Sequence, residues 1–530
     1  MIATSNEFKQ VASGTIRPIA QNALISFTKQ RSQSMSWFTL DTSQLDGADI
    51  LATEPDDVIQ IWDAYEWNDC SDDVIKMDWA RSVAFPYNVQ SATCDLTLNN
   101  TTQKYTYENT SSPYHGYILP KRPMRTYAGF KKDGTAETVP VFVGLTQKMP
   151  TYQGKNDSTV TFSAMDFLSE IGDTPLKSTI MMRDVRTDEA IASVLDAYGM
   201  DSSMYDLAKG MNVIPFVDFE SGYNSGNILA KLVQAEDGAL WLDEKGIIRF
   251  APRVADLGKE PIWTFGENDI IDITPSRADG IVNHVRIKSD IRKVQDKQPV
   301  FTVTNENGYE QPESDDAYRI KANGTATFWI SFENPVWQAT VNPVQNGAQT
   351  DSNFIAVGLD GTVANANVTA TGTLFSNSMK LDFVNLNGFA VSISFMEIWG
   401  EPAKVVDTID YDAYDEDSVE KFGEMVLEIT DNEFFGSYSN ADAYAMNVLR
   451  RRKDYSPTFT LKVKGNPALQ LGDIITVTHK YAGTYKIVGV NSAISNNEGL
   501  STIMTVEKFE VLYPFILDES QLDGTDVLGG

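Results

Sequence analysis

Alternating apolar and polar positions dominate the first third of the chain and predict β-strands. In residues 92–98 every second position is apolar, so a strand there would have one buried and one solvated face. Residues 139–145 and 159–164 follow a similar pattern, and a proline-punctuated loop at residues 112–123 separates the first of these strands from the others. The region from about Ser36 to Ala164 is therefore predicted to be a β-domain.

The pattern changes to a helical period after residue 170. Ile191, Val194, Leu195 and Tyr198 have the i, i+3, i+4, i+7 spacing of one helix face, and Thr187 is the predicted N-cap. A second helix is expected at residues 227–235, followed by a hairpin that turns at residues 243–246. These elements predict a small α+β domain.

Strands return at residues 281–287 and continue into a segment of different composition. Residues 301–398 are rich in Asn, Thr, Gly, Val and Phe and contain only three Lys or Arg, which favours an inserted β-sandwich. Beyond it, Asp417 and Ser418 open a short helix, and Asn440 is the predicted cap of a longer one. Residues 459–511 then predict a compact antiparallel β-barrel segment.

Together these patterns predict a mainly β, multi-domain fold with a smaller α+β part. The predicted divisions are an N-terminal arm (1–35), a first β-domain (36–169), the α+β domain (170–255), a second β-barrel domain (256–300 with 399–512), the inserted β-sandwich (301–398) and a C-terminal docking segment (513–530).

A twelve-residue segment occurs twice, near opposite ends of the chain. LDTSQLDGADIL at residues 40–51 returns as LDESQLDGTDVL at residues 517–528, with nine of twelve positions identical. Docking onto copies of the chain, or onto similarly built partners, would explain the repeat. Stapling of local strands within one subunit would explain it equally well. The candidate interface residues are Leu40, Asp41, Leu45, Asp46, Gly47, Asp49 and Leu51, and Leu517, Asp518, Leu522, Asp523, Gly524, Asp526 and Leu528.

Composition removes several classes of function. The 73 acidic residues against 43 basic ones give a formal charge of −30, which disfavours sequence-specific nucleic-acid binding. No apolar run approaches the roughly 20 residues of a membrane-spanning helix, and the first residues lack the pattern of a signal peptide. Two cysteines form no disulfide framework, so folding in a reducing cytoplasm is expected.

Catalytic and metal-binding patterns are scarce. His115, His284 and His479 have no metal-ligand spacing, and no G-x-S-x-G elbow occurs. The acidic run from Asp56 to Asp78 is typical of a solvated face, and Asp46–Gly47 is explained by a tight turn as well as by calcium binding. We therefore expect no enzymatic activity, no cofactor and no metal site.

Two tryptophans in the predicted sandwich are candidate glycan contacts. The flat faces of Trp329 and Trp337 suit stacking on pyranose rings. Large aromatic residues are usually buried, however, so core positions are the favoured expectation for both.

Four stretches, taken in order, resemble the minor tail and baseplate-hub proteins of long-tailed bacteriophages. They are ATCDLTLNN with SPYHGYILPKRP (92–123), PVFVGLTQKMPTYQG with VTFSAMDFL (140–168), the helix and hairpin NILAKLVQAEDGALWLDEKGIIRFAPR (within 226–253), and DSVEKFG through LQLGDIITVT (417–478). Each motif alone is unspecific, and their joint order over about 400 residues makes the likeness. The insert at 301–398 departs from the family's minimal pattern.

The resemblance implies a structural protein of the virion tail tip, assembled in the host cytoplasm. The implied form is a ring, most simply a homotrimer, that closes or continues the tail tube. The implied partners are a distal tail ring protein, a tape-measure protein and tip fibre or spike proteins, with phage DNA passing the lumen without specific binding. Two alternatives stay open: a carbohydrate-binding surface adhesin that uses the 301–398 sandwich on host surface glycan, and a tail-associated cell-wall glycosidase.

Overall fold

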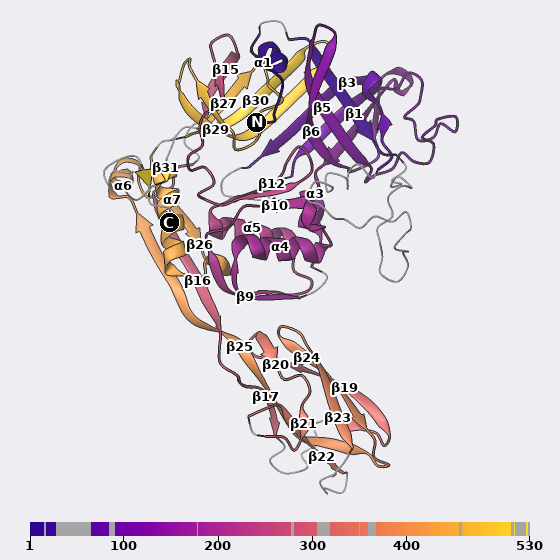
Figure 1. The fold of residues 1–530 in the computed structure, drawn as a ribbon, viewed down its shortest axis with the longest axis vertical. Helices are drawn as coiled ribbons and strands as arrows, with labels where there is room; N and C mark the ends of the chain where they lie inside the picture. The colour runs from indigo at the N-terminus through magenta and orange to yellow at the C-terminus, as the bar shows by residue number, and fades with distance from the viewer. Residues whose placement is uncertain are drawn as a thin grey trace.

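The computed structural model has a mainly β fold, with a large sheet at one end, helices in the middle and a projecting β lobe at the other end (Figure 1). The predicted mainly β, multi-domain fold class is thereby confirmed. The structure describes residues 1–14, 17–27, 65–83, 91–176, 179–276, 280–304, 318–348, 350–358, 367–454, 458–509, 513–514 and 526–527.

The large sheet contains fourteen strands drawn from both ends of the sequence. Its main path runs β15-β27-β30-β29-β3-β4-β8-β6-β5-β1-β2, with β7, β14 and β28 attached beside it. The strands are β1 (Ile19–Ile25), β2 (Asn68–Asp69), β3 (Val74–Ser82), β4 (Thr93–Asn99), β5 (Pro123–Lys132), β6 (Thr135–Thr146), β7 (Thr151–Gln153), β8 (Thr159–Met165), β14 (Trp263–Phe265), β15 (Ile270–Ser276), β27 (Thr458–Val463), β28 (Ile474–Val477), β29 (Gly483–Ser495) and β30 (Gly499–Lys508).

One strand pair joins the two halves of this sheet. β29 pairs antiparallel with β3, from Gly489 opposite Ser82 to Ser495 opposite Lys76. The pairing therefore connects strands from two of the domains predicted from the sequence. The alternation noted in residues 92–98 works as expected, because Cys94, Leu96 and Leu98 of β4 are buried in the core beneath the first half. Helix α1 (Asn6–Ser13) covers this sheet through Phe8, whose ring lies 5.0 Å from that of Phe130.

The middle of the molecule is a helical region built on a second hydrophobic core. Its helices are α3 (Phe167–Asp173), α4 (Thr187–Tyr198), α5 (Ser225–Glu236), α6 (Glu416–Phe422) and α7 (Tyr438–Arg452), with the 3-10 turns η4 (Ser202–Met204) and η5 (Glu433–Phe435). The 3-10 turns η2 (Ser71–Asp73) and η3 (Lys155–Asp157) lie beside strands of the large sheet. Short sheets accompany them: β9 (Ile180–Arg186) with β11 (Val213–Phe219), and β10 (Tyr205–Leu207), β13 (Ile248–Ala251) and β12 (Ala239–Leu242). Ile191, Val194 and Leu195 of α4 are buried as their spacing predicts.

Two predicted helix caps are wrong. Thr187 is the first residue of α4 and its hydroxyl donates to buried Glu236 instead, over 2.9 Å. Helix α7 begins at Tyr438 rather than after Asn440, because the Ser437 side chain accepts a hydrogen bond from the Asn440 amide. At α7 the Ser437 side chain takes the capping role expected of Asn440, whereas the cap position of α4 is Arg186, whose amide donates to Glu189 Oε2 at 3.0 Å.

The projecting lobe, here called the arm, is the predicted β-sandwich. Its first sheet contains β17 (Gln298–Thr304), β18 (Arg319–Ile320), β20 (Val336–Ala339), β21 (Val344–Gln345), β22 (Asn353–Gly358) and part of β25 (Val391–Tyr414), and its second contains β19 (Gly324–Ser331), β24 (Ser378–Asn385) and β23 (Val368–Leu374). Between the sheets lies a core that includes Phe354, Met379, Leu381 and Phe383. The inserted sandwich is therefore a closed hydrophobic unit.

A long two-stranded ribbon carries the arm. β25 spans 24 residues, roughly 80 Å at 3.3 Å per residue. Its first half pairs with sandwich strands, and its second half pairs with β16 (His284–Val294), which itself pairs with β26 (Val426–Ile429) of the helical region. Figure 1 shows this ribbon running from the helical region to the arm.

An ion pair between a half-buried arginine and a fully buried carboxylate ties α5 to α7. Asp237 caps the C-terminus of α5 in the left-handed conformation, and its fully buried carboxylate accepts hydrogen bonds at 2.7 and 2.6 Å from Arg451. Asn447 of the same helix also donates to it. A carboxylate in such surroundings needs its cation, because desolvation without a partner is costly.

Replacing Arg451 with Ala is expected to lower the free energy of unfolding by about 2–4 kcal/mol, since it leaves the Asp237 charge buried without its ion pair. Urea unfolding followed by circular dichroism measures the change. The control is Arg183→Ala, which removes an exposed ion pair with Asp184 on β9 and should cost less than about 1 kcal/mol. Equal effects of the two variants would contradict this account.

Candidate functional site

Most of the repeated segment lies outside the described residues. This holds for Leu40, Asp41, Leu45, Asp46, Gly47, Asp49 and Leu51, and for Leu517, Asp518, Leu522, Asp523, Gly524 and Leu528. Asp526 and Val527 form strand β32 (Asp526–Val527), which pairs in parallel with β31 (Tyr513–Pro514). Docking and stapling both remain predictions for the repeat.

The two candidate tryptophans have different surroundings. Trp337 on β20 is half-buried and meets Phe216 of the helical region edge to face, with ring centroids 6.5 Å apart. Trp329 on β19 is 61% exposed, and its ring centroid lies 5.4 Å from that of Phe375. The expected core position is wrong for Trp329, because the alternation of β19 points Phe328 and Ile330 inward and this residue outward. Its contact with glycan remains a prediction.

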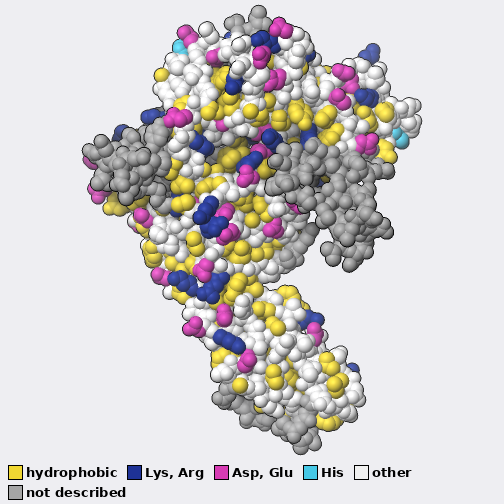
Figure 2. Space-filling view, in the orientation of Figure 1, with side chains coloured by type: hydrophobic (Ala, Val, Ile, Leu, Met, Phe, Trp, Pro, Cys, Tyr) yellow, Lys and Arg dark blue, Asp and Glu magenta, His cyan; other side chains and the backbone are white. Residues whose placement is uncertain are grey.

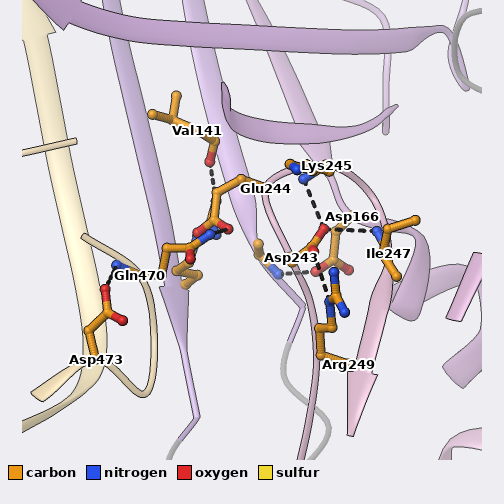
Figure 3. A network of polar contacts seen from close by, with 11 residues as sticks. Val141, Asp166, Asp243, Glu244, Lys245, Ile247, Arg249, Gln470 and Asp473 are labelled. Atoms are coloured by element: carbon orange, nitrogen blue, oxygen red, sulfur yellow. Dashed lines mark hydrogen bonds and ion pairs between the residues drawn. The ribbon is translucent and has the colours of Figure 1, made fainter. Parts of the chain in front are cut away.

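Four segments meet at a buried polar site that we call the junction, formed by Arg81, Val141, Glu244 and Gln470. Figure 3 labels the last three of these residues. The Arg81 guanidinium, on β3, donates to the Glu244 carboxylate and to the Val141 carbonyl on β6. The Gln470 side chain, from the loop before β28, donates to the other oxygen of Glu244. Arg81 and Glu244 are both buried, so the junction fixes the helical region against the large sheet.

The turn that joins β12 to β13 places the Glu244 side chain in the junction. Asp243 holds the turn by accepting hydrogen bonds at 2.9 Å from the amides of Lys245 and Ile247 and from Arg249 Nε (Figure 3). Gly246 closes the turn at φ +89°, a conformation that glycine adopts without strain. The predicted turn at residues 243–246 is thus confirmed, with the adjacent glutamate directed into the interior.

Asp166 is a second buried carboxyl near the junction (Figure 3). It caps α3 by accepting from the Leu168 amide at 3.1 Å, and it accepts from the Ala92 amide at 2.7 Å. Burial raises the pKa of this carboxyl to about 6, although the backbone hydrogen bonds and the Arg81 charge oppose the shift. Asp166 thereby connects the start of β4 to the helix that enters the helical region.

His284 is the one histidine of the three with carboxylate partners in the described residues. Its Nδ1 lies 2.6 Å from Glu424 Oε1 and its Nε2 lies 2.5 Å from Asp412 Oδ1. The hydrogen bond with His284 lowers the pKa of Asp412. Arg286 also pairs with both acids. These contacts hold the first residue of β16 against β25 and against the segment that precedes β26.

The parts of the chain that the structure describes also contain His115, His479 and both cysteines. There, no three His, Cys, Asp or Glu side chains are grouped so as to hold a metal ion, and no helix is long and apolar enough to cross a membrane. His115 Nδ1 lies 3.0 Å from the Tyr107 carbonyl. Cys70 and Cys94 are free thiols, and burial raises the pKa of Cys70 to about 11.

No protein-family model matches the sequence, and no curated protein matches it. Solved structures do align with the chain. A tail protein from Neisseria meningitidis MC58 is 9% identical, with 84% of this chain and 94% of that one covered and a TM-score of 0.44. The 43 kDa tail protein of prophage MuSo2 from Shewanella oneidensis is 12% identical, with 83% and 94% covered and a TM-score of 0.41.

A third aligned structure is the E. coli c3393 protein, a component of the type VI secretion system with structural similarity to the T4 tail proteins gp27 and gp5. It is 8% identical, with 83% of this chain and 74% of that one covered and a TM-score of 0.37. The resemblance found in the sequence is also to phage tail proteins. At these identities and TM-scores the alignments assign no role to any residue.

Replacing Arg81 with Met is expected to lower the free energy of unfolding by about 3 kcal/mol, because buried Glu244 then carries an unpaired charge. The double variant R81M/E244Q should recover part of this loss, since it removes the charge and keeps an acceptor for Gln470. Urea unfolding of both variants measures the coupling. The control Lys76→Met removes an exposed ion pair with Asp78 and should cost less than about 1 kcal/mol. A double variant less stable than R81M would contradict the assignment.

The Asp166 carboxyl should make stability depend on pH. Its pKa is raised from 3.8 to about 6 in the folded chain. The contribution of the neutral carboxyl to the free energy of unfolding is therefore complete below about pH 4 and is lost as pH rises through about 6. The free energy of unfolding of wild type relative to Asp166→Asn should therefore fall by about 3 kcal/mol across this window, at 1.36 kcal/mol per unit. Urea unfolding at half-unit pH steps measures it, and a constant difference would refute the raised pKa.

Proposed function

We propose that this chain is a structural component of a bacteriophage tail, acting as a hub at the distal end of the tail tube. In this role its large sheet contributes to the wall of a ring, most simply a homotrimer. The ring closes or continues the tube, contacts a distal tail ring protein and the tape-measure protein, and anchors tip fibre or spike proteins.

The observation that carries the proposal is the continuity of the large sheet. Segments of the first, second and fourth stretches that resemble tail-hub proteins all supply strands to it: β4, then β6 and β8, then β27 and β28. The third stretch supplies α5 and the hairpin that enters the junction. Pieces of the resemblance that are hundreds of residues apart thus form one connected body, as a wall-forming subunit requires.

The large sheet also has strand edges with which neighbouring subunits could pair. Among the described strands, β15 has a partner on one side only, and at the opposite end of the path β2 has only two residues. Ile271 on β15 is exposed. An open strand edge is a ready surface for pairing with another chain, so subunits arranged around an axis could extend the sheet from one copy to the next.

The electrostatics suit passage of DNA without binding. A formal charge of −30 per chain repels phosphates, and in a ring the charges of all copies add. The hub acts mechanically in this proposal and performs no catalysis. Its ion pairs at the junction and between α5 and α7 join the parts of each subunit.

Native mass spectrometry of the full chain, with and without residues 518–530, tests the proposal. We expect a trimer for the full chain, because the ring requires contacts between copies. Loss of the trimer in a truncated chain with unchanged circular dichroism would assign docking to the repeat. A truncated chain that misfolds would assign stapling to it. A chain that stays monomeric at all concentrations and with added partner tail proteins would contradict the hub.

A further inference from the structure

The outer face of the three-stranded sheet β19-β24-β23 has an unusual surface chemistry. Inward positions of these strands are apolar and fill the core of the arm, as with Phe328, Leu381 and Ala370. Outward positions are mostly hydroxyl-bearing, and one large aromatic ring stands among them. Two adjacent rows, read across β19, β24 and β23, are Thr327–Asp382–Thr371 and Trp329–Lys380–Thr373.

We propose that this face binds a neutral, pyranose-based glycan, with Trp329 as the stacking platform. The rows lie about 7 Å apart along the strands, and neighbouring strands are about 4.8 Å apart, so the face is large enough for more than one sugar ring. A pyranose has an apolar face of C–H groups and an equatorial rim of hydroxyls. The Trp329 row offers a surface for the first, and the Asp382 row offers partners for the second.

The aromatic platform is held in place before any ligand arrives. Trp329 is 61% exposed, yet its ring leans on Phe375 with 30° between the ring planes. Phe375 lies in the turn that joins β23 to β24, where its amide donates to the Ser378 carbonyl over 2.8 Å. A braced ring loses little rotational freedom on binding, which favours affinity.

Polar partners beside the ring are also positioned. Asp382 accepts from Thr327 Oγ1 at 2.5 Å and from Lys380 Nζ at 2.8 Å, and these bonds lower its pKa so that it stays ionised. An ionised carboxylate accepts hydrogen bonds from sugar hydroxyls, and the ammonium retains further N–H groups that donate to them. Side chains in these fixed positions therefore offer a sugar hydroxyl both a hydrogen-bond acceptor and a hydrogen-bond donor.

The charge of the face selects the class of glycan. Lys380 and Asp382 neutralise each other, and the other residues of both rows are uncharged. In Figure 2 the arm is mostly white, with few charged side chains on the side shown. The whole chain, by contrast, carries a charge of −30, which repels anionic polymers. A hydroxyl-rich, uncharged ligand matches this face better than an acidic polysaccharide.

Position on the molecule agrees with a recognition role. The arm stands at the far end of the ribbon from the large sheet (Figure 1), so ligand bound there would not obstruct the sheet edges. The inference does not rest on ring assembly, because a monomeric chain would carry the same face.

Titration of the full chain by isothermal calorimetry tests this site. The probes are neutral oligosaccharides of glucose, galactose, mannose and N-acetylglucosamine, with oligogalacturonate as the anionic probe. We expect at least one neutral probe to bind. Trp329→Ala should weaken that binding at least tenfold, because the stacking surface is lost, and Asp382→Asn should weaken it severalfold.

The matched control is Val344→Ala, which truncates an equally exposed apolar residue, 62% exposed, on the other sheet of the arm. Its affinity should equal that of wild type, and all variants should keep the wild-type circular dichroism spectrum. The proposal is overturned if no neutral probe binds, if only oligogalacturonate binds, or if W329A binds as tightly as the control variant.

Discussion

The pairing of β3 with β29 is the constraint on which the rest of the body depends. These two strands come from opposite ends of the sequence, and their pairing joins two sets of strands into one sheet. Arg81 sits opposite Val490 in this register, and its side chain reaches the junction. A shift by one residue would turn Arg81 to the other face of the sheet and separate it from Glu244. The position of the helical region is therefore coupled to a single strand register.

A second constraint is the length of β25. One strand belongs to the sandwich at its start and to the helical region at its end, so the arm has no separate linker at this point. A two-stranded ribbon resists stretching along its axis because both of its backbones are already close to full extension. The register of its two strands shifts once, between Ile291 and Arg292 of β16. Beside the ribbon, Trp337 of the arm meets Phe216 and Asn377 donates to Glu220, so the arm also contacts the helical region directly.

Local patterns allowed much of the fold to be predicted, whereas contacts between distant segments did not follow from them. The alternation in residues 92–98 and the helical spacing from Ile191 to Tyr198 correspond to β4 and α4, because each element buries one face. The β3–β29 pairing could not be derived this way, since periodicity shows that a strand exists and not which strand lies beside it. Glu244 illustrates the same limit: a glutamate in a hairpin turn is ordinarily solvated, and only the tertiary contact with Arg81 explains its burial.

The ion pairs at the junction and between α5 and α7 serve the arrangement of parts more than the stability of each part. Moving a carboxylate and a guanidinium out of water costs several kcal/mol, and their attraction roughly offsets that cost. The hydrophobic cores of the sheet, the helical region and the arm already supply the favourable term for each part. Arg81 with Glu244, and Arg451 with Asp237, each join elements far apart in sequence. An apolar contact tolerates sliding, whereas a hydrogen-bonded pair is satisfied in one geometry, so these pairs specify how the parts meet.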